Sequence, residues 1–265
     1  MPYPESARGD RLFSFKQYVC VITSGGTGIG LMAAQALIAN GARVYIVCSD
    51  REALVQTAES LRASKGGSII PSRNASVNLV VAAAGSESVR GTAPDMDAKE
   101  LQQMLFAEDQ ANWISTFNTN VSAMYFTVCL NFRRPAASQT DAVRPSPSCR
   151  CSRSVATTGT LNPLLLSASK AATIHLSKMM AYEFKEFNVR VNCIAPSYFP
   201  SNDKEEGTAN KGGPLDEQTQ LVPVGEKGGT ESGIAQGVLF LAKNRFVTGE
   251  VLNIDNGDFL RNPVN

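Results

Sequence analysis

The sequence predicts an α/β fold with three layers, in which helices cover both faces of a doubly wound, mostly parallel β-sheet. Short apolar runs alternate along the chain with longer stretches of helical periodicity, which is the pattern of repeated strand–helix–strand units. A glycine-rich turn joins the first apolar run to the first helix, as is typical of sheets of this kind. No change in composition divides the chain, so residues 1–265 are expected to form a single domain.

The N-terminal part of the chain contains two strands and two helices in alternation. Tyr18–Ile22 is wholly apolar, as expected for a strand that is buried on both faces. Leu31–Ala39 carries the apolar stripe of a helix, and Asn40-Gly41 is a usual helix stop. Arg43–Val47 is expected to form the second strand, and Arg51–Ala63 the second helix.

The remaining elements follow the same alternation, with two irregular regions. Strands are expected at Ser68–Ile70, Asn78–Ala82, Arg190–Ala195 and Glu250–Ile254, and helices at Trp113–Phe132, Ser167–Phe187 and Glu231–Leu241. Only Pro71–Val77 separates the third strand from the fourth. That connection is too short for a crossover helix, so we expect the third strand to be frayed or displaced. The fifth strand should lie in Arg144–Arg153, where two prolines and three arginines do not suit a central strand, so it is either poorly formed or replaced by a different path.

Composition and charge exclude several classes of protein. The chain has 25 Lys and Arg against 24 Asp and Glu and no long basic run, which argues against nucleic acid or a membrane surface as the main partner. No apolar stretch is long enough to span a bilayer, and the N-terminus has no apolar signal region, so we expect a cytoplasmic location. The six cysteines are scattered and His175 is the single histidine, so no metal site is expected.

The glycine-rich turn has the features of a phosphate-binding loop. It has the sequence TSGGTGIG and lies between a strand and a helix. Glycine lets the backbone approach a pyrophosphate closely, and the N-terminus of the following helix offers free N–H groups and the positive end of its dipole. The sequence therefore predicts a dinucleotide site at this turn. Its residues are Thr23, Ser24, Thr27, Gly28, Ile29 and Gly30.

Several motifs, in the right order, resemble those of the classical short-chain dehydrogenase/reductase family, including its fungal members. Thr23, Gly28 and Gly30 match the family's TGxxxGxG fingerprint, with a serine at the first glycine position. The further matching segments are Val80–Gly85, Thr119–Val121, Ser167–Ala172, Arg190–Pro196 and Val247–Gly257. The resemblance implies a Rossmann-type fold and an oxidoreductase that transfers a hydride between a nicotinamide cofactor and a small organic molecule.

The resemblance also implies the catalytic residues. The family's active-site asparagine corresponds to Asn120, its lysine to Lys170 and its serine to Ser154. Its proton-donating tyrosine, four residues before the lysine, corresponds to Leu166, which has no ionisable proton. Tyr198 is a candidate replacement acid. A substrate that is already cationic, such as an iminium, would need no proton donor.

The end of the second strand bears on the choice of cofactor. An acid there binds the ribose hydroxyls of NAD, whereas a hydroxyl and a cation accept the additional phosphate of NADP. Ser49 and Arg51 fit the phosphate, and Asp50 between them could point away or pair with Arg51. We therefore expect NADP, with NAD as the alternative. The resemblance adds to the cofactor-binding residues Ala84, Gly85, Asn120, Lys170 and Ser197.

The leading hypothesis is an NADP(H)-dependent oxidoreductase that acts on a small organic carbonyl, alcohol or imine in a secondary-metabolite pathway. By analogy with the family, we expect a homo-oligomer. The missing tyrosine and the two irregular regions favour two alternatives. One is a catalytically disabled or non-redox relative that binds nucleotide or a partner without hydride transfer, and the other is a decayed coding sequence.

Overall fold

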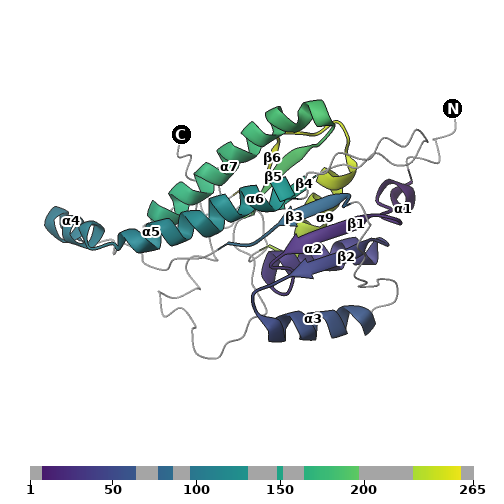
Figure 1. The fold of residues 1–265 in the computed structure, drawn as a ribbon, viewed down its shortest axis with the longest axis horizontal. Helices are drawn as coiled ribbons and strands as arrows, with labels where there is room; N and C mark the ends of the chain where they lie inside the picture. The colour runs from purple at the N-terminus through teal and green to yellow at the C-terminus, as the bar shows by residue number, and fades with distance from the viewer. Residues whose placement is uncertain are drawn as a thin grey trace.

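The computed structural model describes residues 8–63, 77–85, 96–130, 148–151, 164–196 and 229–257. Within these residues, six strands form one parallel sheet in the order β2-β1-β3-β4-β5-β6 (Figure 1). The strands are β1 (Val19–Thr23), β2 (Arg43–Val47), β3 (Leu79–Ala82), β4 (Ser148–Cys151), β5 (Val191–Pro196) and β6 (Val251–Ile254). The α/β class with a parallel sheet is confirmed.

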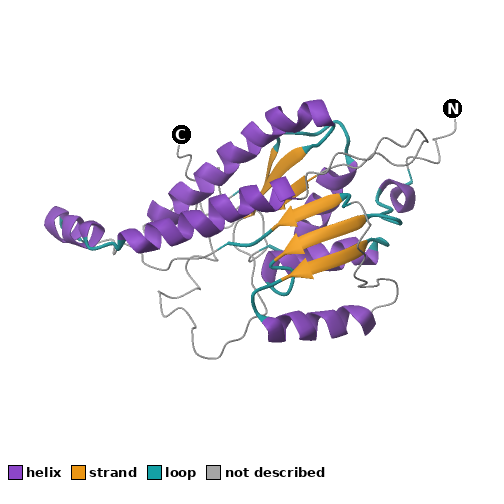
Figure 2. Cartoon of the chain, in the orientation of Figure 1, coloured by secondary structure: helices purple, strands orange, loops and turns teal. Residues whose placement is uncertain are grey.

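Helices lie on both faces of the sheet, which gives the three layers (Figure 2). On one face α2 and α9 pack against each other, and α6 and α7 cover the other face. The α-helices are α1 (Gly9–Leu12), α2 (Gly28–Ala39), α3 (Arg51–Ala63), α4 (Ala98–Phe106), α5 (Gln110–Phe117), α6 (Ala123–Leu130), α7 (Leu164–Phe184) and α9 (Glu231–Lys243). One turn of π-helix, Asn118–Ser122, joins α5 to α6 and is called the π-turn below. A 3₁₀ turn, Lys185–Phe187, follows α7.

Two clusters of buried side chains hold these layers together, one on each face of the sheet. The larger cluster contains Ile22, Val81 and Ile194, packed against α2 and α9. The smaller contains Ala82 and Val191 with side chains of α6 and α7. Successive side chains of a strand point to opposite faces, so β3 contributes Val81 to one cluster and Ala82 to the other. Burial on both faces explains why these strands are apolar throughout.

Of the two alternatives for the predicted fifth strand, the structure excludes a different path. β4 is a short strand in the interior of the sheet, hydrogen-bonded in parallel to β3 on one side and to β5 on the other. Pro145 and Pro147 precede its first residue, Ser148. Because neither proline lies within the paired residues, neither removes a hydrogen bond from the ladder.

β1, β3, β5 and β6 differ from their predicted bounds by only one residue at one or both ends, and the larger differences concern helices. The helix predicted at Trp113–Phe132 begins earlier, at Gln110, and is interrupted at Asn118 by the π-turn. The helix predicted from Ser167 also begins earlier, as α7 does at Leu164. We did not predict α4, which has no buried residue and projects away from the sheet (Figure 1). The predicted third strand lies outside the described residues.

Candidate active site

The end of β1 is tied to the end of β3 by one side chain. Thr23 is the last residue of β1, and its hydroxyl oxygen accepts hydrogen bonds from the backbone N–H groups of Ala83 (3.0 Å) and Ala84 (3.1 Å). These two residues follow β3 directly and lead to Gly85. The bonds hold the glycine-rich turn beside the segment that follows β3, at the carboxyl edge of the parallel sheet.

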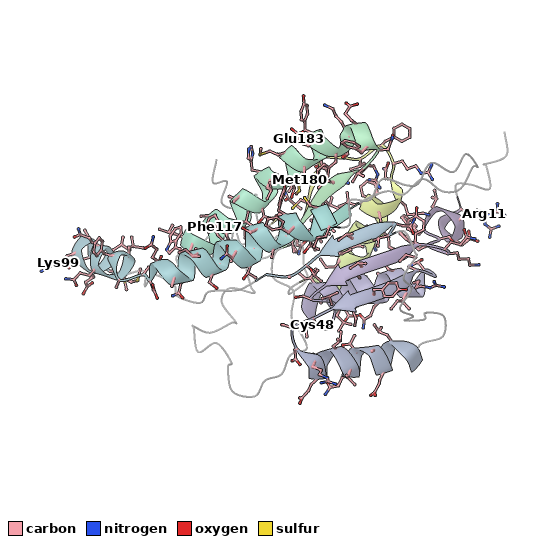
Figure 3. All side chains as sticks on the ribbon, in the orientation of Figure 1. Arg11, Cys48, Lys99, Phe117, Met180 and Glu183 are labelled. Carbon is pink, nitrogen blue, oxygen red and sulfur yellow. The ribbon has the colours of Figure 1, made fainter. Side chains whose placement is uncertain are left out.

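Close contacts require glycine at two positions of the turn. A Cβ atom at Gly30 would collide with the carbonyl oxygen of Ser24, and one at Gly25 would lie 2.5 Å from Cγ2 of Ile46. Ser24 itself has a left-handed backbone with φ 50°, a conformation that glycine adopts without strain. Cys48, labelled in Figure 3, follows β2 beside this turn. The turn is therefore folded tightly against the ends of β1 and β2.

The start of α2 is open on its outer side. Gly28 has φ 51°. Apart from its two chain neighbours and the backbone of its own helix, no atom of the described residues would lie within 4 Å of a Cβ atom there. Thr27 is the N-cap residue, and its side chain makes no capping hydrogen bond. The first N–H groups of a helix have no acceptor within the helix, so this open helix start suits a pyrophosphate. The residues present thus fit the phosphate part of a dinucleotide.

Asp50 caps the helix that follows β2. Its Oδ1 atom accepts hydrogen bonds from the backbone N–H groups of Glu52 (2.8 Å) and Ala53 (3.1 Å), in the first turn of α3. The sequence allowed Asp50 to point away or to pair with Arg51; in the described residues its carboxylate caps α3 and forms no ion pair with Arg51. Ser49 and Arg51 are both exposed on either side of it. The hydroxyl and the cation are therefore accessible at the end of β2.

Asn120 lies in the π-turn and is buried. Its Nδ2 donates a hydrogen bond to Oγ of Ser169 (3.0 Å), and that hydroxyl donates to the carbonyl oxygen of Leu166 (2.8 Å). A hydroxyl has only one hydrogen to donate. Since Ser169 uses it on Leu166, Ser169 can only accept from Asn120. This bond sets which end of the Asn120 amide faces α7, and it leaves Oδ1 on the other side.

Oδ1 of Asn120 and Nζ of Lys170 both lie beside Gly85. A Cβ atom at Gly85 would lie 3.3 Å from Oδ1 and 3.1 Å from Nζ. The lysine comes from α7, the asparagine from the π-turn, and the glycine from the segment that Thr23 ties to the turn. A side chain at Gly85 would fill the space between these groups. The structure thus brings together Asn120, Lys170 and Gly85, three of the residues that the resemblance implies for the site.

Leu166 lies one turn before Lys170 on α7, with its side chain 5% exposed. Its side chain has no proton to donate, so any acid used here comes from another residue. Ser154, Ser197 and Tyr198 lie outside the described residues, and their roles remain predictions.

Two residues that contact Asn120 are missing from the sequence prediction. Ser169 accepts from its amide, and Thr173 donates to its backbone carbonyl oxygen (3.0 Å). A signal was present: hydroxyl residues recur every fourth position along α7 at Ser169, Thr173 and Ser177. Polar residues at this spacing lie on one face of a helix. That they would face the π-turn depends on how the helices pack.

The described ranges also bear on metal binding and on membrane-spanning helices. In these residues, no group of three or more His, Cys, Asp or Glu side chains is placed to hold a metal ion. No helix in the same part of the chain combines the length and the apolar character needed to cross a membrane.

Comparison with known proteins relates almost the whole chain to one group. A family model described as enoyl-(acyl carrier protein) reductase matches residues 25–258. The chain is 32% identical over 280 residues to the short-chain dehydrogenase/reductase PhomF′ of Diaporthe leptostromiformis, covering 93% of this chain and 92% of that protein. It is 29% identical over 248 residues to the 3-oxoacyl-(acyl-carrier-protein) reductase FabG of Chlamydia muridarum, covering 89% and 95%.

A solved structure gives the same relation at the level of the fold. The complex of Pseudomonas aeruginosa RhlG with NADP at its active site superposes with a TM-score of 0.71 and 26% identity. The match covers 93% of this chain and 98% of that one. The range of the family model, residues 25–258, includes the π-turn, α7 and all but the first two residues of the glycine-rich turn.

Proposed function

Because this chain belongs to the short-chain dehydrogenase/reductase family of oxidoreductases, we propose that it is an NADP(H)-dependent enzyme that acts on a small organic carbonyl, alcohol or imine. The observation that carries the proposal is that Lys170 Nζ and Asn120 Oδ1 both lie beside Gly85. These groups lie at the same sheet edge as the open, glycine-lined start of α2.

In this proposal the two ends of the cofactor bind different parts of the sheet edge. The glycine-rich turn and the first N–H groups of α2 bind the pyrophosphate. Lys170 binds the nicotinamide ribose through its ammonium group, and Oδ1 of Asn120 also lies beside Gly85. Gly85 has no side chain, and so leaves room beside both. When bound, the cofactor supplies or accepts the hydride.

The proposed preference for NADP depends on the residues after β2. The Asp50 carboxylate is engaged at the start of α3, so it is turned away from a ribose. Ser49 and Arg51 remain accessible, and a hydroxyl with a guanidinium suits a phosphate. The NADP complex of RhlG, a relative over nearly its whole length, supports the same choice.

The proposed substrate class follows from Leu166. Reduction of a carbonyl to an alcohol requires a proton for the new hydroxyl, and a leucine cannot supply it. Tyr198 could supply it in place of a residue at position 166, with Ser154 contacting the substrate. An imine that is already cationic, an iminium, accepts a hydride to give a neutral amine with no further proton, which makes it the natural alternative to a carbonyl.

Fluorescence titration with NADPH and NADH tests cofactor binding. We expect a submicromolar Kd for NADPH in the wild-type protein. Arg51→Ala should weaken NADPH about tenfold while hardly affecting NADH, because it removes a phosphate contact. Arg43→Ala is the matched control, since Arg43 is also exposed but lies at the opposite end of β2. Binding of neither nucleotide would overturn the proposal in favour of a relative without redox activity.

Two variants test the source of the proton. If the rest of the site is complete, Leu166→Tyr should gain reduction of a carbonyl substrate, measured as NADPH oxidation. If Tyr198 is the acid, Tyr198→Phe should abolish carbonyl reduction. An unchanged rate in Tyr198→Phe removes that residue from the mechanism. A wild-type protein that reduces an iminium but no carbonyl would make the imine the preferred substrate class.

We also propose that the enzyme is a homo-oligomer through α6 and α7. Phe126 and Leu130 on α6, and Met179 and Tyr182 on α7, are exposed. On each helix they lie opposite the side chains that enter the smaller core cluster. Apolar side chains grouped in this way are typical of an interface between proteins.

Light scattering after size-exclusion chromatography tests the oligomer. The wild-type protein should have a mass of at least two chains, and the double substitution Phe126→Glu with Leu130→Glu should give a monomer. Phe246→Glu is the control, because Phe246 is fully exposed but follows α9 instead. A monomeric wild-type protein would contradict this interface.

A further inference from the structure

Three buried hydroxyl groups lie one helical turn apart along α7. Ser169, Thr173 and Ser177 are 0%, 3% and 2% exposed. Their four-residue spacing places them on one face of the helix, and α7 packs against the π-turn that contains Asn120. Buried hydroxyls require hydrogen-bond partners, and the partners of the first two include Asn120.

Thr173 links α7 to the backbone of the π-turn. Its single hydroxyl hydrogen is shared between two carbonyl oxygens, that of Asn120 at 3.0 Å and that of Ser169 at 2.9 Å. The Ser169 carbonyl belongs to the same helix, where the N–H group of Thr173 is its regular partner. The Asn120 carbonyl belongs to a different element. The bond to Asn120 is therefore the one that joins the two elements.

This bond stabilises a backbone conformation that is otherwise rare. π-Turns are uncommon within helices and frequently mark functional sites, and a buried carbonyl without a donor is costly. Asn120 is held at two points by α7, its carbonyl by Thr173 and its amide nitrogen by Ser169. With both points held, its side-chain oxygen lies beside Gly85 and faces the space that Lys170 enters.

We propose that Thr173 is a positioning residue whose hydroxyl holds the π-turn against α7 and so sets the position of Asn120 relative to Lys170. The consequence of this positioning role for ligand binding rests on the proposed function, in which Lys170 binds the nicotinamide half of the cofactor. Ser177 provides a matched control. It is equally buried on the same face, and its hydroxyl donates to the Thr173 carbonyl within α7 (2.7 Å).

Hydrogen–deuterium exchange of the full chain tests the structural part of the proposal. Thr173→Val keeps the side-chain shape without the hydroxyl, and Thr173→Ser keeps the hydroxyl. We expect exchange in residues 118–124 to rise about tenfold in Thr173→Val, to stay near the wild-type rate in Thr173→Ser, and to be unchanged in Ser177→Ala. Thr173→Ala replaces the valine variant if that variant does not fold. Unchanged exchange in the variant without the hydroxyl overturns the proposal.

Binding of NADPH and of 2′,5′-ADP tests the consequence for the site. The second probe carries only the adenosine half of the cofactor. Thr173→Val should weaken NADPH about tenfold and change the Kd of 2′,5′-ADP by less than about twofold, because Thr173 acts at the nicotinamide end. General damage to the fold would weaken both probes equally, and this result overturns the positioning role. If the wild-type protein binds neither probe, the proposed function fails, and the exchange experiment still tests Thr173.

Discussion

Gly28 and Gly30 are both needed in the turn before α2, but for different physical reasons. A Cβ atom at Gly30 would collide with the Ser24 carbonyl oxygen, which is backbone and cannot move without opening the turn. At Gly28 the surrounding space is open, and only the positive φ of 51° disfavours a side chain. One glycine therefore maintains the fold, whereas the other keeps space at the helix start.

Alanine at these two positions should separate stability from binding. We expect Gly30→Ala to lower the free energy of unfolding by about 2–3 kcal/mol, and Gly28→Ala by about 1 kcal/mol. Urea denaturation measures both values. Gly28→Ala should remain folded yet bind NADPH more weakly, because its methyl group enters the space proposed for the pyrophosphate. Equal losses of stability in the two variants would contradict this assignment.

Among the helices, α3 depends on a charged cap at its first turn. Asp50 accepts two backbone hydrogen bonds there, and a carboxylate at a helix N-terminus also interacts favourably with the helix dipole. We expect Asp50→Ala to cost about 1 kcal/mol of stability. Asp50→Ser should recover most of it, because serine is also a good N-cap residue. Thermal denaturation compares the three proteins.

The same variants test where the Asp50 carboxylate points. Since the carboxylate faces α3, Asp50→Ser should leave the ratio of NADPH to NADH affinity unchanged. A marked rise in preference for NADPH in this variant would show that the carboxylate repels the ribose phosphate, and would refute the orientation described above.

For the molecule as a whole, a buried thiol in the sheet makes the stability depend on pH. Cys20 lies in β1 within the larger core cluster, where burial raises the pKa of its thiol to about 12, from 9.0. A thiol that ionises more easily in the unfolded chain stabilises the fold below pH 9, and this contribution is lost as the pH rises toward 12.

We therefore expect the free energy of unfolding to fall above pH 9. The fall should be about 1.4 kcal/mol for each pH unit between the two pKa values of Cys20. Urea denaturation at pH 8, 9 and 10 measures the fall, because these values bracket the ordinary thiol pKa of 9.0. Cys20→Ala should be less stable at pH 8 but lose less on going to pH 10. If both proteins lose the same amount, Cys20 does not carry the effect. Burial also raises the pKa of Tyr18, so Tyr18→Phe serves as the comparison.

Local sequence signals predicted most of the elements and part of the site. Arg43–Val47 and Arg51–Ala63 were predicted with the bounds that the structure shows, because apolar periodicity and helix-start residues act within a few positions. Asn120 and Lys170 were identified by family motifs, and they lie together as those motifs imply. In contrast, the sequence alone suggested that β4 was doubtful, since the prolines and arginines of Arg144–Arg153 hide the apolar pattern.

The sequence by itself established the class of fold, the glycine-rich turn and the absence of an acidic proton at Leu166, because these follow from residue type and from spacing along the chain. Tertiary structure alone placed Thr173 against the π-turn and turned the Asp50 carboxylate into α3. It also brought Lys243 to the Ser14 carbonyl, 229 positions away. Such contacts depend on how whole elements pack, and no local pattern encodes which of many exposed or buried polar groups will meet.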